Sequence, residues 1–569
     1  MNRKFLLISI SFLLVAVTLA GAHVTRTLAS DYTDVSVTVA NTMIEQRPSL
    51  VILDVRNQSE YDSGHIRNAK LIPVWQLAAR LDELSKSDEI LVYCEKGARS
   101  QTASLTLADN GFQHVYNMLE GITAWISAGY PVYIKYPSLQ EAINNASEGD
   151  TINVSSGLYY EHLTINKSLT LNGENKYKTM IDGSDNGTVI NVKADNTTVT
   201  ELTIQYSGCS CSDYSGIYIK NYHQNVNIAN NLIVQNGYGI KLIWANNTTI
   251  DNNEVTNNTS GVEVIFSYNN TIAGNNISNN FFGLDLNPSS NNTIIGNNIA
   301  NNTIHDIMIR QSSNDNILLK NNVTGSPYGV RLYASFNNTF KENNLFNNAI
   351  GIDIQNSTDN TFHQNNFNSN KRHVQFFEIG YTNLWDDGYL SGGNYWSNYT
   401  GVDSNHDGIG DSAQVLDSSN KDNYPLLGRF YSCTTPAGKT LDMISNSTIE
   451  DFQYSEPDST IRIHVSSSSQ NQKSGFFRAA IPHDLMLPPY NLTINGDPTN
   501  YATIYENDTL SIIYFTYQHS TLEIDIIPEL PTLVFLPLFM TLTLLTFVAR
   551  RRKRSRNLHK QETQQSLAL

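Results

Sequence analysis

A repeat of about 22 residues fills the middle of this 569-residue chain and restricts its fold more than any other feature. An apolar residue that closes an Asn-rich turn recurs at intervals of 22, 22, 22, 23, 23 and 22 residues. The members of this column are Ile228, Ile250, Ile272, Ile294, Ile317, Phe340 and Phe362. A second column contains only asparagine: Asn231, Asn253, Asn275, Asn297, Asn321, Asn343 and Asn365. A third contains glycine: Gly216, Gly239, Gly261, Gly283, Gly329 and Gly351.

Short runs of alternating apolar residues, separated by Asn, Gly and Ser, are typical of strands and turns and not of helices. One coil of such a repeat cannot bury its apolar face alone, but stacking places each strand about 4.8 Å from its copy. Asparagine tolerates left-handed backbone, and its amide can bond to the amide one coil away. We therefore predict a right-handed parallel β-helix over residues 135–430, with an internal asparagine ladder.

This segment resembles NosD-like surface and periplasmic proteins and the wider superfamily of carbohydrate-binding and sugar-hydrolase β-helices. The resemblance includes a short capping helix at residues 138–143 and closing segments at residues 385–388 and 392–399, whose aromatic side chains are expected to cap the stack. It implies a surface that binds cell-surface glycans. It also suggests copper, but we find no His, Met and Cys constellation in the sequence and predict no copper site.

The run Cys94-Glu95-Lys96-Gly97-Ala98-Arg99-Ser100 is the feature that most directly suggests covalent chemistry. It follows an apolar strand predicted at residues 90–93 and precedes a helix predicted at residues 100–109. A thiol in such a place faces backbone N–H groups and the positive end of a helix dipole, which both favour the nucleophilic thiolate. Arg99 adds a fixed positive charge.

Residues 33–134 around this run resemble a rhodanese domain, an α/β fold. The matching pieces are Leu53-Asp54-Val55-Arg56, Glu60-Tyr61, Gly64-His65-Ile66, Asn68-Ala69, Ile72-Pro73, Leu119-Glu120-Gly121-Ile122, Ala124-Trp125 and Ala128-Gly129-Tyr130-Pro131-Val132. The resemblance implies a persulfide on Cys94 and an anionic sulfur donor. It assigns the binding of this donor to Arg99 and to the loop formed by Glu95, Lys96, Gly97, Ala98 and Ser100. The six-residue loop resembles the sulfurtransferase form, and a rhodanese domain used only for binding is the alternative.

Two carboxylates in the β-helix raise a third functional alternative. The strand position after each Gly-apolar pair is expected to point outward, which places Glu263 and Asp285 on adjacent coils, about 5 Å apart at the backbone. Paired carboxylates at that separation could cleave a glycosidic bond with retention. We favour a mixed-charge solvated face over a polysaccharide hydrolase or lyase.

An acidic loop near the end of the β-helix predicts calcium. Oxygen ligands recur at alternate positions, with Gly408 suited to a tight turn and Gln414 where an EF-hand has its bidentate glutamate. The expected ligands are Asp403, Asn405, Asp407, Ile409 and Asp411. The alternative is an Asx-turn loop without metal.

The two ends of the chain predict export and a membrane anchor. Residues 1–22 have the charged, apolar and small-residue order of a secretory signal, and residues 530–549 are long and apolar enough to span a bilayer. The basic tail at residues 550–569 should stay in the cytoplasm, with the folded mass outside. Residues 431–527, which show alternating strands, are predicted to form a β-sandwich stalk.

The net charge of −16, with basic residues concentrated at the C-terminus, argues against nucleic acid as a partner. Four cysteines do not make a disulfide scaffold. Cys209 and Cys211 could bind a soft metal or pair with another cysteine, although an ordinary polar loop is favoured. Glycosylation is expected at some of the Asn-x-Ser/Thr sites, for example Asn247, Asn276, Asn322, Asn337 and Asn398.

Overall fold

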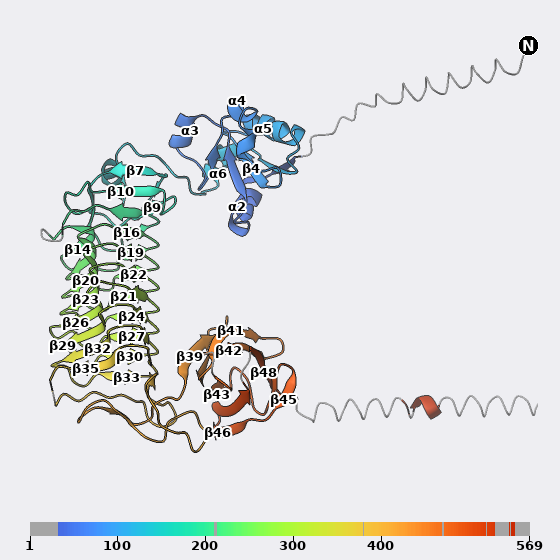
Figure 1. Cartoon of the computed structure of the whole chain (residues 1–569). Coiled ribbons are helices and arrows are strands. Elements are labelled where there is room, and N and C mark those ends of the chain that lie inside the picture. The colour runs from blue at the N-terminus through green and yellow to red at the C-terminus, as the bar shows by residue number, and fades with distance from the viewer. Residues whose placement is uncertain are drawn as a thin grey trace, which may run out of the picture. The chain divides into compact units, whose positions relative to one another are not determined.

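The structure is a computed structural model that describes residues 32–209, 213–378, 380–468, 472–518, 521–529, 546 and 548–551. The predicted signal at 1–22 lies outside these residues, as do most of the predicted span at 530–549 and of the basic tail at 550–569. In the part of the chain that the structure describes, no helix is both long and apolar enough to cross a membrane. The chain divides into two compact units, Met1–Met308 and Ile309–Leu569 (Figure 1).

The first unit begins with an α/β domain built on a parallel sheet of strand order β1-β5-β4-β2-β3. The strands are β1 (Thr33–Val35), β2 (Val51–Asp54), β3 (Lys70–Leu71), β4 (Glu89–Tyr93) and β5 (His114–Met118). The helices are α2 (Val37–Gln46), α3 (Gln58–Asp62), α4 (Val74–Leu77), η2 (Leu81–Glu83), α5 (Ala98–Asp109) and α6 (Gly121–Ser127). Separate apolar clusters join α4 and α5 to one face of the sheet and α2 and α6 to the other. The predicted α/β domain is confirmed.

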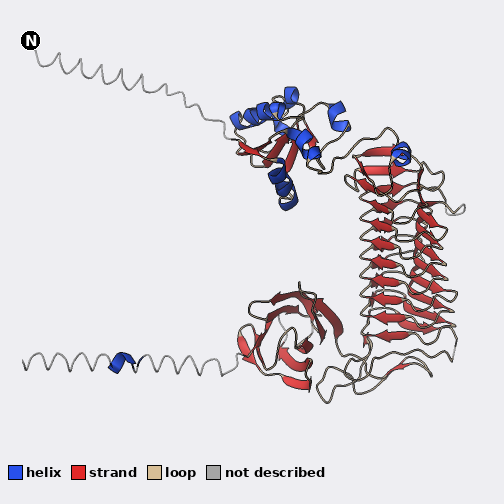
Figure 2. Cartoon of the chain, turned by 180° about the vertical axis from the view of Figure 1, so that it is seen from behind, coloured by secondary structure: helices blue, strands red, loops and turns tan. Residues whose placement is uncertain are grey.

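The coils of a parallel β-helix follow in the same unit, after the short helix α7 (Leu139–Asn145) (Figure 2). The first sheet contains β6 (Thr151–Val154), β9 (Thr170–Gly173), β12 (Thr198–Thr200), β15 (Asn227–Ala229), β18 (Thr249–Asp251), β21 (Thr271–Ala273) and β24 (Thr293–Ile295). The second contains β7 (Gly157–Tyr160), β10 (Thr179–Asp182), β13 (Thr203–Gln205), β16 (Leu232–Val234), β19 (Glu254–Thr256), β22 (Asn276–Ser278) and β25 (Asn298–Ala300). The third contains β8 (Leu163–Ile165), β11 (Ile190–Val192), β14 (Ser215–Lys220), β17 (Tyr238–Ile243), β20 (Ser260–Ile265) and β23 (Phe282–Asn287), and β26 (His305–Arg310) spans the boundary between the units.

The predicted asparagine ladder is present inside these coils. Asn253 Nδ2 donates to Asn275 Oδ1 at 3.0 Å, and Asn275 Nδ2 donates to Asn297 Oδ1 at the same distance. Each amide also bonds to backbone groups, so the buried turns are satisfied by side chains. A parallel ladder through Asn236, Asn258 and Asn280 was not predicted.

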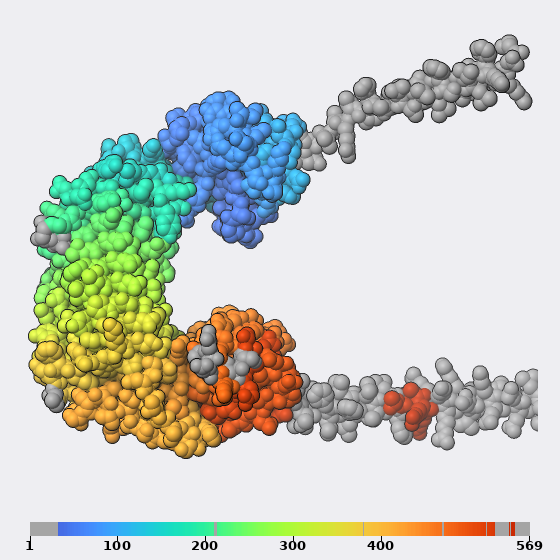
Figure 3. All heavy atoms as spheres, in the orientation of Figure 1, coloured from blue at the N-terminus to red at the C-terminus, as the bar shows by residue number. Residues whose placement is uncertain are grey.

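The first coil of the β-helix is bonded directly to the α/β domain. Glu174 is 2% exposed, and its carboxylate lies 3.1 Å from Nε2 of the fully buried His65. Its two oxygens also accept hydrogen bonds from the backbone N–H groups of Asn68 and Ser156, each at 2.8 Å. The surfaces of the two parts are continuous in Figure 3, where they are blue and cyan. The junction is therefore a polar contact sealed from water.

The second unit holds further coils of the same three-strand pattern. They comprise β27 (Ile317–Leu319), β30 (Thr339–Lys341) and β33 (Thr361–His363), then β28 (Asn322–Thr324), β31 (Asn344–Phe346), β34 (Asn366–Asn368) and β36 (Tyr395–Trp396), then β29 (Tyr328–Tyr333), β32 (Ile350–Gln355) and β35 (Arg372–Phe376). Trp385 and Trp396 close this end, because each stacks 4.3 Å from the last core phenylalanine of its column and is at most 1% exposed. The predicted aromatic cap is confirmed. The short hairpin β37 (Gln414–Val415) and β38 (Lys421–Asp422) follows it.

Two sequence interpretations need correction. Ile317 does not belong to the buried apolar column: it is 45% exposed, whereas Leu318 is 1% exposed and pairs with Phe340. The asparagine column has its longer interval in this coil, 24 residues from Asn297 to Asn321, and marks the correct register. Cys209 is disulfide-bonded, so the favoured polar-loop interpretation was wrong there; Cys211 lies outside the described residues.

A β-sandwich ends the described fold, as predicted. One antiparallel sheet has the order β39 (Arg429–Thr434), β40 (Thr440–Ser445), β43 (Ser474–Pro482), β47 (Leu510–Gln518) and β46 (Ala502–Glu506). The other has the order β41 (Thr448–Ser455), β42 (Thr460–Ser466), β48 (Leu522–Pro528), β44 (Tyr490–Ile494) and β45 (Asp497–Thr499). Their inner faces share one apolar core.

Candidate functional site

Cys94 lies at the carboxyl end of β4, directly before the helix α5. The backbone N–H of Gly97 donates to Cys94 Sγ at 3.1 Å, and the residue is 2% exposed. Gly97 has φ of +96°, a conformation that glycine adopts without strain. The helix begins at Ala98 and not at Ser100 as predicted, so its positive end is closer to the sulfur.

Helix α6 holds the backbone of this loop from the other side. Ile122 N–H donates to Cys94 O at 2.8 Å, and Thr123 N–H donates to Glu95 O at 3.1 Å. Gly121 is required at this contact, because a Cβ there would lie 2.3 Å from Cys94 O. The loop carbonyls are thereby turned away from the thiol. The sequence resemblance included Gly121, but its role was not foreseen.

Arg99 is held by a carboxylate that the sequence analysis did not assign to the site. Its guanidinium donates to both oxygens of Glu60, at 2.8 and 2.5 Å, and lies 3.6 Å from Glu95. Hydrogen bonding to Arg99, against a smaller opposing effect of burial, lowers the pKa of Glu60 to about 2. An anionic donor would therefore have to share Arg99 with Glu60.

The remaining loop residues divide by exposure. Glu95, Lys96 and Ala98 are exposed, whereas Ser100 is buried and donates from Oγ to Gly97 O at 2.9 Å. Ser100 thus fixes the turn and does not face solvent. The assignment of these residues to donor binding stays a prediction.

Asp54 and Arg56 form a buried ion pair beside the site. Arg56 donates to both carboxylate oxygens of Asp54 and to Gly64 O at 2.7 Å, and the two residues are 0% and 5% exposed. This geometry indicates a structural role for the pair, since both charges are used within the fold.

Comparison with known proteins identifies this domain. The family described as "Rhodanese-like domain" matches residues 36–128. A sulfurtransferase of Allochromatium vinosum is 32% identical over 83 residues, which are 15% of this chain and 78% of that protein. The thiosulfate sulfurtransferase GlpE of Coxiella burnetii is 33% identical over 94 residues, 16% of this chain and 87% of that protein. The chain belongs to the rhodanese-like family.

Two further similarities fall within the rhodanese-like domain. YrkF of Bacillus subtilis is 35% identical over 97 residues, 17% of this chain, and the chain spans only 52% of its length. A crystal structure of a rhodanese-related protein from Thermoplasma volcanium is 29% identical, with a TM-score of 0.17. The match covers 18% of this chain and 100% of that structure.

The β-helix matches a second family, described as "Periplasmic copper-binding protein (NosD)", at residues 143–317 and 283–401. The chain is thus a rhodanese-like domain followed by a NosD-like β-helix. Among the described residues, no three His, Cys, Asp or Glu side chains are grouped so that they could hold a metal ion. The donor set described here does not fit copper, and we derive no copper chemistry.

The carboxylates Glu263 and Asp285 are adjacent in register, as expected, but their face is not solvated. Lys241, Glu263 and Asp285 are 3%, 8% and 8% exposed, so this part of the prediction was wrong. Lys241 Nζ lies 3.9 Å from the Tyr238 ring centroid and 3.6 Å from Glu263 Oε2. Aromatic cover and internal ion pairing bury the column.

The loop predicted to bind calcium uses its carboxylates to hold its own backbone. Asp403 accepts hydrogen bonds from the N–H groups of Asp407 and Gly408, both at 2.9 Å. Asp407 accepts from Ile409 N–H, and Asp411 accepts from Ser404 N–H. Asn405 donates to Asp407 at 2.9 Å, so the loop is compact. Calcium at this loop stays a prediction.

Proposed function

We propose that the rhodanese-like domain transfers sulfane sulfur through a persulfide on Cys94. The observation that carries this proposal is the 3.1 Å hydrogen bond from Gly97 N–H to Sγ at the first turn of α5. A backbone donor and a helix dipole stabilise a thiolate and, equally, the terminal sulfur of a persulfide anion. The names of the relatives from Allochromatium vinosum and Coxiella burnetii support the same chemistry.

Thiosulfate serves as the anionic donor in the proposed reaction. The Cys94 thiolate attacks the sulfane sulfur, a new S–S bond forms, and sulfite leaves with the electron pair of the broken S–S bond. A second nucleophile, such as cyanide or a thiolate, then takes the outer sulfur and regenerates the Cys94 thiolate. Neither step needs an external oxidant or reductant. Arg99 would bind the sulfonate group of thiosulfate through the guanidinium N–H groups that its two hydrogen bonds to Glu60 leave unused.

The full-length chain can be tested by mass spectrometry after incubation with thiosulfate. The expected product carries one additional sulfur atom on the peptide that contains Cys94, and cyanide removes it as thiocyanate. Cys94→Ser should lose the modification. Cys433→Ser is the matched control, because Cys433 is the other thiol that is free in the described structure. Labelling that persists in Cys94→Ser, or no labelling of the wild type by thiosulfate or polysulfide, would refute the proposal.

A non-catalytic binding role is the second candidate, and one observation favours it. Both hydrogen bonds of the Arg99 guanidinium go to Glu60, beside an almost fully buried thiol. In this alternative the rhodanese-like domain is a docking module. With either candidate we propose that the β-helix binds glycans, as its resemblance to carbohydrate-binding β-helices implies. Cys94→Ser would then leave partner and glycan binding unchanged. Cleavage of polysaccharides, by a hydrolase or a lyase mechanism, is the weakest alternative, because Glu263 is ion-paired with Lys241.

We also propose that the protein is exported and held in the membrane by residues 530–549, with residues 550–569 in the cytoplasm. The order of residue types at both ends of the sequence supports this, as does the similarity of the β-helix to a family of periplasmic proteins. The disulfide at Cys209 also supports it, since disulfides persist mainly in oxidising compartments. Protease treatment of intact cells should digest the folded mass; full protection of it would contradict export.

A further inference from the structure

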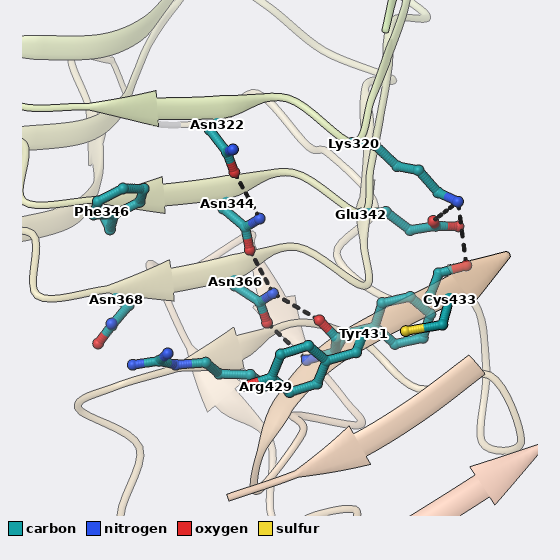
Figure 4. A pocket seen from close by; sticks show the side chains of 12 residues that line it. Lys320, Asn322, Glu342, Asn344, Phe346, Asn366, Asn368, Arg429, Tyr431 and Cys433 are labelled. Atoms are coloured by element: carbon teal, nitrogen blue, oxygen red, sulfur yellow. Dashed lines mark hydrogen bonds and ion pairs between the residues drawn. The ribbon is translucent and has the colours of Figure 1, made fainter. Parts of the chain in front are cut away.

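A cavity of about 590 Å³ lies in the second unit, between the outer face of the β-helix and the first strand of the sandwich. One wall consists of residues from β28, β31 and β34, and the other consists of residues from β39 (Figure 4). Its volume is within the usual range for small-molecule sites. It is distinct from the Cys94 site and from the Glu263–Asp285 column.

A row of amides forms the polar wall of this cavity. Asn344 Nδ2 donates to Asn322 Oδ1 at 2.9 Å, and Asn366 Nδ2 donates to Asn344 Oδ1 at 2.7 Å. Figure 4 shows the three side chains following one another on successive strands. The backbone of Phe430 fixes the end of the row, because its N–H and C=O bond to the Asn366 amide at 2.8 and 2.9 Å.

This row is a rigid array of donors and acceptors. Each amide offers two N–H groups and two oxygen lone pairs. Both N–H groups of Asn366 are used, by Asn344 and by Phe430 O, whereas the bonds within the row use only part of the capacity of Asn322 and Asn344. Successive amides are spaced by the distance between coils, about 4.8 Å. Alternating donors and acceptors at fixed spacing suit the hydroxyl groups of a sugar chain, since each hydroxyl both donates and accepts.

The two basic residues that line the cavity differ in their ion pairing. Lys320 is paired with Glu342 at 3.4 Å and donates to Ser432 at 3.3 Å. Arg429 also lines the cavity and makes no ion pair with any side chain that the structure describes. The cavity therefore presents one guanidinium without a fixed counter-ion. A carboxylate is its best partner, because the guanidinium can bond both carboxylate oxygens.

We propose that this cavity binds an acidic oligosaccharide. The hydroxyl groups of the sugar chain bond to Asn322 and Asn344, whose row Asn366 holds in place, a uronic acid carboxylate bonds to Arg429, and an apolar ring face packs on Phe346. The proposal rests on the glycan-binding role proposed above and places it at the junction of β-helix and sandwich.

Cys433 provides an internal probe of occupancy. It is a free thiol that lines the same cavity, and burial raises its pKa. A bound sugar chain should protect it from alkylation by a maleimide. In full-length Cys94→Ser protein, where Cys433 is the remaining free thiol of the described structure, we expect at least a tenfold slower reaction with saturating ligand.

The binding test uses the full-length chain, a hexamannuronate and its neutral methyl ester in calorimetric titrations. Arg429→Gln should weaken hexamannuronate binding by about 10- to 100-fold, the usual value of a hydrogen bond to a charged group, and leave the ester unaffected. Asn344→Leu should weaken the binding of both ligands. Asn276→Leu is the matched control, because Asn276 has the same outward amide position on β22 but lies outside the cavity.

The outcomes separate this inference from the general glycan role. Hexamannuronate binding that neither Arg429→Gln nor Asn344→Leu changes would overturn the cavity assignment and leave glycan binding intact. Failure of both ligands to bind the wild type would overturn the cavity assignment and the glycan role together. If propane-1,2,3-tricarboxylate bound as tightly as hexamannuronate, binding would not depend on the row of amides. This result would also overturn the inference.

Discussion

Glu174 of the β-helix and His65 of the rhodanese-like domain form a buried pair, with 3.1 Å between Oε1 and Nε2. The other ring nitrogen of His65 lies 2.9 Å from Tyr61 O, so both nitrogens face oxygen acceptors. The His65 ring also stacks on Tyr61 at 3.7 Å. Tyr61 and Glu60 are neighbours in α3, and Glu60 holds Arg99. A continuous series of contacts therefore connects the β-helix with the Cys94 loop.

The first prediction concerns the stability of this junction. Burial opposes ionisation of Glu174, but hydrogen bonds from His65 and Ser156 outweigh it and lower its pKa from 4.5 to about 2. The carboxylate therefore stabilises the fold above pH 4.5, and this stabilisation is lost as the pH falls toward 2. The corresponding free energy is about 3 kcal/mol. Glu174→Gln should lower the free energy of unfolding by that amount at pH 7, and by much less at pH 3.

Urea denaturation of wild type and Glu174→Gln at both pH values measures this difference. Glu141→Gln is a suitable control, since Glu141 lies on the nearby α7 and is exposed. A constant difference between wild type and Glu174→Gln across the pH range would contradict the role assigned to the carboxylate.

The second prediction concerns Glu60 as a positioning residue for Arg99. Glu60→Gln keeps the size of the side chain but removes the ion pair with the guanidinium. If Arg99 binds the donor anion, loss of its fixed orientation should raise the KM for thiosulfate about tenfold, with a smaller change in kcat. Steady-state kinetics of thiocyanate formation measures both constants. An unchanged KM would show that the orientation of Arg99 does not matter for donor binding.

The third prediction concerns the asparagine ladder. Asn275 is 1% exposed, accepts from Asn253 N–H at 2.9 Å and donates to Ile250 O at 2.8 Å. Asn275→Leu leaves both buried backbone groups without partners, and each such loss costs about 1–3 kcal/mol. The melting temperature of the β-helix should fall clearly in calorimetry. The neighbouring Asn276 is exposed, so an equal effect of Asn276→Leu would argue against the ladder as the cause.

The fourth prediction concerns calcium at the loop that contains Asp403, Asn405, Asp407, Ile409 and Asp411. If the ion binds the folded loop, a concentration one hundred times its Kd should stabilise the fold by about 2.7 kcal/mol. Calorimetry should show a higher melting temperature with Ca²⁺ than with EGTA, and Asp403→Asn should reduce the difference. Identical melting curves in Ca²⁺ and EGTA would favour the Asx-turn loop without metal.

The sequence predicted those elements whose cause is local or periodic. The asparagine column indicated both the coil register and the ladder, because each coil repeats the same packing problem. The apolar column gave the wrong residue at Ile317, because hydropathy alone does not show which of two neighbouring apolar residues points into the core. The position of Cys94 between a strand and a helix was also predictable from a short segment.

Contacts between distant segments were not predictable in this way. The pairing of Glu60 with Arg99 crosses 39 residues, and that of His65 with Glu174 crosses 109 residues and a domain boundary. The burial of Lys241 was missed for a related reason. Alternation along a strand predicts which side a residue faces, but not what covers that side.

The capped end of the β-helix has a consequence for how such proteins change in length. Coils that carry the asparagine ladder meet their neighbours through the same kinds of amide and apolar contacts, whereas Trp385 and Trp396 are specific to the last coil. A genetic duplication or deletion of one such repeat would preserve the contacts between the remaining coils and the two tryptophan side chains that cap the last one. The length of the β-helix can therefore change during evolution in steps of one coil, while its junction with the rhodanese-like domain and its tryptophan cap stay unchanged.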